Sequence, residues 1–341
     1  MINWTSPLLF IFVFLIAMVF AKLCAKYGAV FVYANENKIP RIGGLAIMFA
    51  WWCAALMFGF VTKERFWPLI IATLVILVVG LLDARRALRP FFQLIAQIII
   101  AIIVVYWGNF SINYISNPFG GVISLNNASL LGIFAGDFFA VFWIVAMINV
   151  INFMDGLDGL AGSVTGVALI TIGFVSVLPQ VNDYGTAVAS FAATAAIAGF
   201  LFWNLPPAKL FLGTVGSWFL GFLIAILAIQ GATKVATTAV VGAVPLIDAI
   251  IVVFGRLRMG HSPFRGDLTH LHHRLKRRGI SDRAILAIYT TCSVLLGVAA
   301  VILQTHNKII LFVIFSVGLI VFVMIGSQYA KRRIRNSKLT G

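Results

Sequence analysis

The chain has 341 residues, of which 62% are hydrophobic and only 10% carry a charge. Soluble domains have about 25% charged residues, so this composition excludes a soluble globular protein and predicts side chains that face lipid or neighbouring helices. The formal net charge of +15 would suit a polyanion-binding protein. The basic residues, however, lie in short loops between apolar segments, where they act as signals of membrane topology. We therefore expect an integral membrane protein that binds no nucleic acid.

In chain order, eleven apolar segments are each nearly long enough to cross the hydrocarbon core as a helix. They cover residues 6–22, 44–62, 67–83, 91–108, 130–150, 159–178, 187–203, 209–228, 235–255, 284–303 and 308–327. The first segment lacks a basic n-region and a small-residue cleavage site, so we interpret it as a retained helix. The expected fold class is an all-α polytopic membrane protein with about 11 transmembrane helices, in which residues 1–341 form a single domain.

The loops that connect these segments differ strongly in charge. When they are assigned alternately to two sides, one side receives all but four of the 25 Lys and Arg residues. The four on the other side are Lys63, Arg65, Lys234 and Lys308. The positive-inside rule then predicts that the N-terminus lies outside and the C-terminus in the cytoplasm.

Carboxylates and carboxamides gather at the cytoplasmic ends of the predicted helices. Asp83 closes the third segment, and the run from Asn149 to Gly159 places Asn149, Asn152, Asp155 and Asp158 at steps of three. An ionisable residue at a membrane helix end is costly and favours a functional role. Converging oxygen ligands of this kind suit Mg²⁺. The simpler alternative is a capped helix start, since Asp and Gly also favour caps and turns.

A second polar loop contains Asn204 and then the segment Gly213-Thr214-Val215-Gly216-Ser217. Glycines at a helix start let backbone N–H groups approach an anion, which the helix dipole also favours. The alternative is that these small residues serve close helix packing.

The longest polar stretch, near residues 256–283, carries four of the five histidines. His270, His272 and His273 stand within four residues of one another, and Arg265 and Arg274 flank them. Arg binds phosphate oxygens, and His donates hydrogen bonds or moves protons near neutral pH. This loop therefore suits a pyrophosphate, although a solvated basic loop is the alternative.

Five blocks in this order make the sequence resemble the polyprenyl-phosphate N-acetylhexosamine-1-phosphate transferases, the MraY/WecA/TagO-like superfamily (glycosyltransferase family 4). The blocks are Pro40-Arg41-Ile42-Gly43-Gly44, the span-ending Asp83, residues 149–162, residues 204–217 and His270-Leu271-His272-His273. The predicted topology places all five on the cytoplasmic side, in loops near 35–44, 83–90, 149–162, 204–217 and 256–283. The resemblance thus spans most of the chain.

The resemblance implies transfer of a sugar-1-phosphate from a UDP-sugar to undecaprenyl phosphate, with release of UMP. N-acetylglucosamine-1-phosphate is the first candidate for the sugar-1-phosphate, and the product would start a cell-envelope polysaccharide such as lipopolysaccharide or teichoic acid. It also implies Mg²⁺ as cofactor, a multi-pass protein of the inner membrane with a cytoplasmic active site, and a possible homodimer. The physics agrees, because a lipid phosphate and a soluble nucleotide sugar meet at this interface.

The resemblance also assigns roles to individual residues. Asp83, Asp155 and Asp158 are expected to be catalytic, and Asn152 and Thr214 to hold the metal. The residues expected to bind the nucleotide sugar are Asn204, Arg265, His270, His272 and His273.

Three positions depart from the family pattern. Ala84 replaces a second aspartate, Gln93 replaces a basic residue, and Thr214 replaces an aspartate that would ligate Mg²⁺. A hydroxyl is a far weaker ligand than a carboxylate for a hard cation. One alternative is therefore a catalytically silent family member that binds lipid or a partner. An unrelated transporter is another, and it would need ionisable residues in mid-span, for which only Asp248 comes close.

Overall fold

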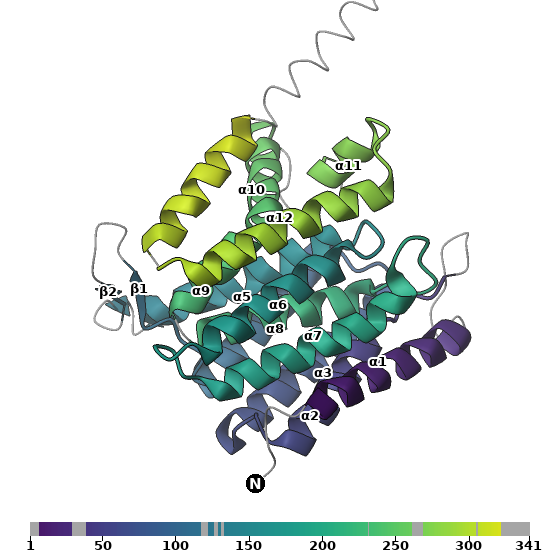
Figure 1. The fold of residues 1–341 in the computed structure, drawn as a ribbon, viewed down its shortest axis with the longest axis horizontal. Coiled ribbons are helices and arrows are strands. Elements are labelled where there is room, and N and C mark those ends of the chain that lie inside the picture. The colour runs from purple at the N-terminus through teal and green to yellow at the C-terminus, as the bar shows by residue number, and fades with distance from the viewer. Residues whose placement is uncertain are drawn as a thin grey trace, which may run out of the picture.

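The computed structural model describes residues 7–28, 39–116, 122–125, 129–130, 133–230, 232–260, 269–304 and 306–321. Helices make up most of this part of the chain (Figure 1). Their bounds are α1 Pro7–Tyr27, α2 Gly44–Phe58, α3 Lys63–Arg85, α4 Pro90–Ile102 with a π-helical continuation Ile103–Trp107, α5 Ala135–Met154, α6 Leu160–Val177, α7 Tyr184–Asn204, α8 Gly213–Ile229, α9 Ala232–Val241, α10 Ala243–Arg258, α11 Leu271–Lys276, α12 Asp282–Ile302 and a last helix His306–Val321.

Seven of the described helices are long and apolar enough to cross a membrane: α1, α3, α4 with its continuation, α5, α6, α7 and α12. The pair α9–α10 passes the same test as one bent unit, and α2, α8 and His306–Val321 are shorter apolar helices. Each of the eleven predicted segments overlaps one of these helices or the bent pair. The structure thus confirms an all-α polytopic membrane protein.

One predicted segment has a different shape from the one expected. Residues 235–255 do not form a straight span, because the chain bends by 75° between α9 and α10. Gly242 stands at the break, and Pro245 lies in the first turn of α10. A proline is tolerated there because the first N–H groups of a helix have no partner within it.

Helix α8 forms the centre of the bundle. Every residue of α8 except Thr214 is buried, and α2, α3, α5, α6 and α9 pack around it. Where α8 meets α2, a Cβ placed on Gly44 would lie 2.1 Å from the Cα of Gly216. Only glycine at both positions permits this approach, so the Pro40–Gly44 block and the glycine-rich loop are matched parts of one helix contact.

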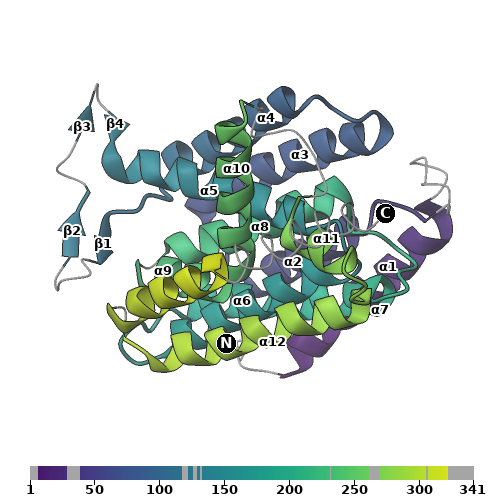
Figure 2. The ribbon, with the colours of Figure 1, turned by 90° about the horizontal axis from the view of Figure 1, so that it is seen from above.

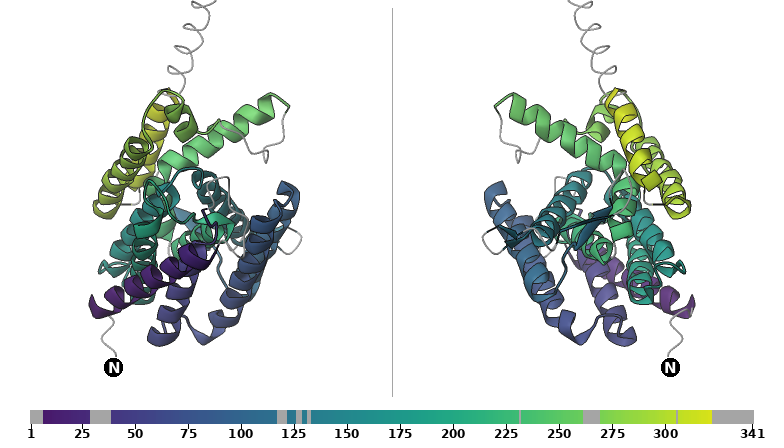
Figure 3. Two further views of the ribbon diagram at one scale, coloured as in Figure 1. Left: turned by 90° about the vertical axis from the view of Figure 1, so that its right-hand side faces the viewer. Right: turned by 90° about the vertical axis from the view of Figure 1, so that its left-hand side faces the viewer.

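The outer helices present apolar side chains to their surroundings. Leu8 is 72% exposed in α1, and Ile302 is 75% exposed in α12. Helix α10 rises away from the bundle (Figure 3) and exposes Ile250, Phe254 and Leu257. Apolar surface exposed to this extent is typical of a protein whose outer helices face lipid.

Two short antiparallel strand pairs lie at one end of the bundle, and α11 lies at the other (Figures 1 and 2). The pairs are β1 Tyr114–Ser116 with β2 Val122–Ser124, and β3 Ser129–Leu130 with β4 Ile133–Phe134. The sequence pattern did not predict these strands.

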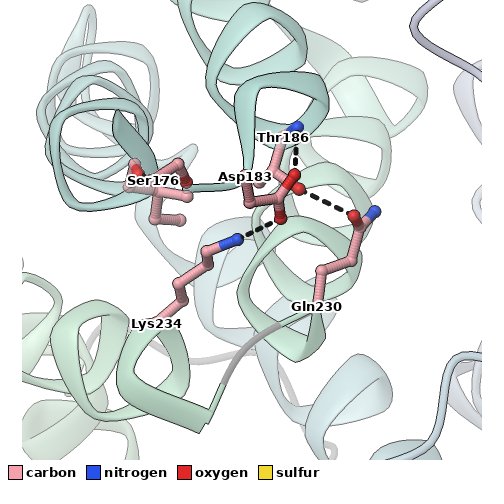
Figure 4. Close-up of polar contacts among 6 residues, drawn as sticks. Ser176, Asp183, Thr186, Gln230 and Lys234 are labelled. Atoms are coloured by element: carbon pink, nitrogen blue, oxygen red, sulfur yellow. Dashed lines mark hydrogen bonds and ion pairs between the residues drawn. The ribbon is translucent and has the colours of Figure 1, made fainter. Parts of the chain in front are cut away.

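A buried polar cluster also marks the end that carries the strands (Figure 4). The ammonium of Lys234, a residue with no exposed surface, lies 2.5 Å from the Asp183 carboxylate. The same carboxylate accepts the Thr186 N–H at 3.0 Å and so caps α7. The Thr186 hydroxyl in turn donates to Gln230 at 2.6 Å. This cluster joins α7, α8 and α9 through contacts that are satisfied within the protein.

Candidate active site

A cavity of about 440 Å³ opens at the end of the bundle opposite the strands. Its walls come from the end of α3, the α5–α6 turn, the α7–α8 connection, α10 and the start of α11. The lining residues are Arg41, Asp83, Ala84, Asn152, Phe153, Asp155, Gly156, Leu157, Asp158, Asn204, Phe211, Gly213, Thr214, Arg256, His270 and His273. The structure therefore brings together eight of the ten residues that the sequence singled out.

Asp83 stands at the last turn of α3 and is held by three hydrogen bonds. One carboxylate oxygen accepts the Leu88 N–H and the Gln93 amide, both at 2.9 Å. The other oxygen accepts the Thr214 hydroxyl at 2.5 Å. Two of the positions that depart from the family pattern, 93 and 214, thus contact this one carboxylate.

The Asn/Asp run divides into a helical part and a turn. Asn149 and Asn152 belong to the last turns of α5, which ends at Met154, and Gly159 has a φ of +76° before α6 begins. Asn149 bonds to Gln97 of α4 and does not line the cavity. Asn152 lines the cavity, where its carbonyl oxygen accepts the Ser217 hydroxyl at 2.9 Å.

Burial dominates the electrostatics of Asp155. Burial raises the pKa of its carboxyl to about 7, although Arg41 and the Gly213 N–H stabilise the ionised form, and the neighbouring Asp158 raises it further. A carboxylate in this condition gains when a cation or a hydrogen-bond donor arrives. Its electrostatics are those of a binding or catalytic group.

Asn204 and Asp158 connect the two polar loops to each other. Asn204 is buried, accepts the Gly159 N–H at 3.0 Å and donates to the Leu210 carbonyl at 2.9 Å. Asp158 accepts the Ala208 N–H at 3.0 Å. Asn204 therefore positions the loops around the cavity, and its expected contact with the nucleotide sugar stays a prediction.

The Pro40–Gly44 block reaches the site by pairing with the chain before α8. Phe211 donates its N–H to Pro40, and Gly43 donates to Phe211, both at 2.9 Å. At Gly213 φ is +72°, and a Cβ there would lie 2.0 Å from the Arg41 carbonyl oxygen. Glycine is thus required at 213, and the pairing places Arg41 on the cavity wall.

Three histidines gather beside the α5–α6 turn. The His270 ring lies 2.9 Å from Asp248, whose other oxygen accepts the Leu271 N–H at 2.9 Å. His272 and His273 pack with ring centroids 4.1 Å apart. A Cβ on Gly156 would lie 3.1 Å from His272. The turn and the histidine segment are therefore packed closely enough to act as one site.

The histidines differ in their exposure to the cavity. His270 and His273 line it, whereas His272 lies behind them in a small void shared with Asp248 and Tyr289. Burial, together with the nearby His273, His270 and Lys276, lowers the pKa of His272 to about 3. His272 is therefore neutral at physiological pH. Arg265, also expected to bind substrate, lies outside the described residues.

The donor set suits a hard divalent cation. Carboxylate, carboxamide and hydroxyl oxygens line the cavity, and Asp155 is a buried acid that such a cation would neutralise. Among the described residues, no three His, Cys, Asp or Glu side chains lie close enough together to hold a metal ion by themselves. A bound cation would thus depend on substrate phosphates for further ligands, as Mg²⁺ often does.

The sequence analysis did not assign roles to three residues of the site. Arg41 was named only as part of a block, Arg256 was covered only by the polar stretch 256–283, and Asp248 was named only as the nearest candidate for a mid-span acid. Asp248 pairs with His270 and holds the start of α11. An acid inside an apolar span was the available signal for Asp248.

The model of glycosyl transferase family 4 matches residues 66–232 of the chain. A probable undecaprenyl-phosphate N-acetylglucosaminyl 1-phosphate transferase of Bacillus subtilis is 31% identical over 324 residues, which cover 92% of this chain and 87% of the relative. Undecaprenyl-phosphate α-N-acetylglucosaminyl 1-phosphate transferases of Pasteurella multocida and Escherichia coli K12 are 31% and 28% identical. These two matches cover 82% and 94% of this chain, and 80% and 90% of the relatives. The chain belongs to glycosyl transferase family 4.

Proposed function

We propose that this protein transfers N-acetylglucosamine-1-phosphate from UDP-N-acetylglucosamine to undecaprenyl phosphate and releases UMP. The observation that carries the proposal is that Asp83, Asp155 and Asp158 line the same cavity as Arg41, Arg256, His270 and His273. It lies at the end of the helices, where a lipid phosphate from the membrane and a nucleotide from solution can both reach it. The relatives' names describe N-acetylglucosaminyl 1-phosphate transferases that act on undecaprenyl phosphate.

The reaction is a displacement at phosphorus. An oxygen of the lipid phosphate forms a bond to the sugar-bearing phosphorus of the UDP-sugar, and the bond from that phosphorus to the bridging oxygen breaks. UMP leaves with the bridging oxygen. Positioning and charge stabilisation supply most of the catalysis in such transfers.

The residues divide this work by charge. Arg41 and Arg256 contribute positive charge at the cavity wall, where they bind phosphate oxygens. His270, fixed by Asp248, and His273 donate hydrogen bonds to the nucleotide sugar, and Asn204 holds the loops around it. His272 and Arg265 belong to the same predicted substrate-binding segment.

We propose Mg²⁺ as the cofactor, held by Asn152 and Thr214 beside the three aspartates. When bound there, Mg²⁺ would supply positive charge to offset that of the diphosphate and of the leaving UMP. Asp83, already anchored by Gln93 and Thr214, sets the position of the lipid phosphate.

The proposed topology has eleven crossings, with the bent pair α9–α10 counted as one. The N-terminus is outside, the C-terminus is in the cytoplasm, and the active site faces the cytoplasm from the inner membrane. The positive-inside pattern supports this orientation, because the site end carries most of the basic loops. A homodimer belongs to the proposal only as an expectation from the family.

The direct test is UMP release by the purified protein from UDP-N-acetylglucosamine and undecaprenyl phosphate, with Mg²⁺ and with EDTA. We expect turnover that EDTA abolishes and that Asp155→Ala removes. Asp137→Asn is the matched control, because Asp137 pairs with Ser111 outside the cavity, and it should retain turnover. A folded parent protein that releases no UMP from several UDP-sugars would overturn the proposal.

Neither alternative gains support. The comparisons do not favour a catalytically silent family member, since the relatives carry transferase names. The transporter hypothesis depended on Asp248 as an acid in mid-span, but the Asp248 carboxylate contacts the His270 ring at the edge of the candidate site.

A further inference from the structure

Tyr289 is a buried side chain of α12 that lies behind the histidine segment, residues 269–276. Only 2% of it is exposed. Its hydroxyl lies beside the backbone N–H of His272 without reaching hydrogen-bond geometry, and no other described residue pairs with it. Buried polar groups in native proteins nearly always have a hydrogen-bond partner. The hydroxyl of Tyr289 therefore calls for a partner or a role.

A small polar void supplies the partner. The void measures about 10 Å³, and Tyr289, Asp248, His270 and His272 are among the residues that line it. This volume is close to the space that one water molecule needs, and a buried water is stable where several polar groups surround it. The Asp248 carboxylate, the histidine rings and the Tyr289 hydroxyl are such groups. The void thus suits one bridging water.

His272 connects the void to the α5–α6 turn and to the cavity. Because its ring is neutral at physiological pH, it has one N–H donor and one acceptor nitrogen. Its Nε2 atom is buried without a hydrogen-bond partner among the described residues, and a Cβ on Gly156 would lie 3.1 Å from it. The ring also packs on His273, which lines the cavity. A displaced His272 would therefore disturb both the turn and His273.

We infer that Tyr289 is a positioning residue whose hydroxyl, through one water in the void, holds the His272 ring and with it the nucleotide-sugar side of the cavity. Asp248 of α10 already fixes His270, so α10 and α12 hold the histidine segment from two helices. Tyr289 does not line the cavity itself. The inference deepens the proposed function and rests on it for the identity of the ligand.

Tyr289→Phe tests this role, because it removes the hydroxyl and keeps the ring. We expect the KM for UDP-N-acetylglucosamine to rise about tenfold, as for the loss of one buried hydrogen-bonding group. The KM for undecaprenyl phosphate and the turnover number should change far less. A residue that served stability alone would lower the amount of active protein and leave the KM for the nucleotide sugar at the parent value.

Hydrogen exchange provides a readout that needs no turnover. The backbone amides of residues 269–276, measured in substrate-free protein, report how firmly the histidine segment is held. We expect them to exchange about tenfold faster in Tyr289→Phe than in the parent, with α2 unchanged. Tyr184→Phe is the matched control, because it removes an exposed hydroxyl at the start of α7. It should leave the exchange rates and both KM values at the parent level.

The two readouts distinguish the possible failures. Parent-like exchange of residues 269–276 in Tyr289→Phe would overturn the inference, whether or not the protein releases UMP. An unchanged KM for UDP-N-acetylglucosamine in an active enzyme would overturn it as well, and so would an equal rise in both KM values. Faster exchange confined to this segment, in a protein that releases no UMP, would overturn the proposed function and support the positioning role of Tyr289.

Discussion

The two ends of the bundle treat buried acids in opposite ways. At one end, the Asp183 carboxylate pairs with the Lys234 ammonium, and it caps α7 by accepting the Thr186 N–H. Burial opposes ionisation there, but the hydrogen bonds from Lys234 and Thr186 outweigh it and lower the pKa of Asp183. At the other end, burial raises the pKa of Asp155 to about 7. Asp183 is thus compensated within the protein, whereas Asp155 would gain from the arrival of a cation or a hydrogen-bond donor.

The sharpest test of this comparison is to remove one of the acids that line the cavity. We expect Asp158→Asn or Asp155→Asn to lower the turnover number by about a thousandfold, as large as the loss of a key electrostatic contact in other enzymes. Protein folding should be intact, which size-exclusion profiles of the two variants would show. Turnover within tenfold of the parent would place the working acids elsewhere.

The converse experiment is to break the paired acid. Lys234→Met leaves Asp183 partly buried without its cation, and removal of one partner of a buried pair costs about 3–5 kcal/mol. We expect a marked fall in the thermal unfolding midpoint, with turnover of the remaining folded protein unchanged. The double variant Lys234→Met, Asp183→Asn should recover part of the loss. An unchanged midpoint in Lys234→Met would mean that the pair contributes nothing to stability.

The raised pKa of Asp155 predicts a pH-dependent stability. Between the ordinary value of 3.8 and about 7, the native protein keeps a proton that the unfolded chain has released, so stability falls as pH rises through this window. Without metal, Asp155→Asn should therefore unfold at a higher temperature than the parent at pH 8. The difference should shrink as pH falls below 7. Parallel pH profiles for the two proteins would contradict the raised pKa.

The smallest effect is expected at an exposed pair. Lys276 and Asp282 lie 2.9 Å apart, but their side chains are 57% and 35% exposed. Exposed ion pairs contribute about 0–1 kcal/mol, so Lys276→Ala should shift the unfolding midpoint far less than Lys234→Met. A comparable shift in both variants would remove the distinction between solvated and buried pairs.

The local sequence pattern was sufficient to predict most of the helices of this protein because the helices lie in a membrane. Apolar segments of helical length predicted the helices, since an unsatisfied backbone in lipid is too costly for other structures to compete. The same cost explains why Asp83, Asp155 and Asp158, which line one cavity, could be chosen as candidates from their places at helix ends. The 75° bend between α9 and α10 was less predictable, because Gly242 and Pro245 are compatible with either a straight or a broken helix.

The sequence by itself determined the class of protein, the helices and the side on which the polar blocks gather, because hydropathy and charge are properties of single segments. Only the tertiary structure decided which groups touch. It joined Gln93 and Thr214 through Asp83, assigned Asp248 to His270 and separated Asn149 from the cavity. These contacts join residues from different helices, and their distances depend on how those helices pack around α8. No local pattern carries that information.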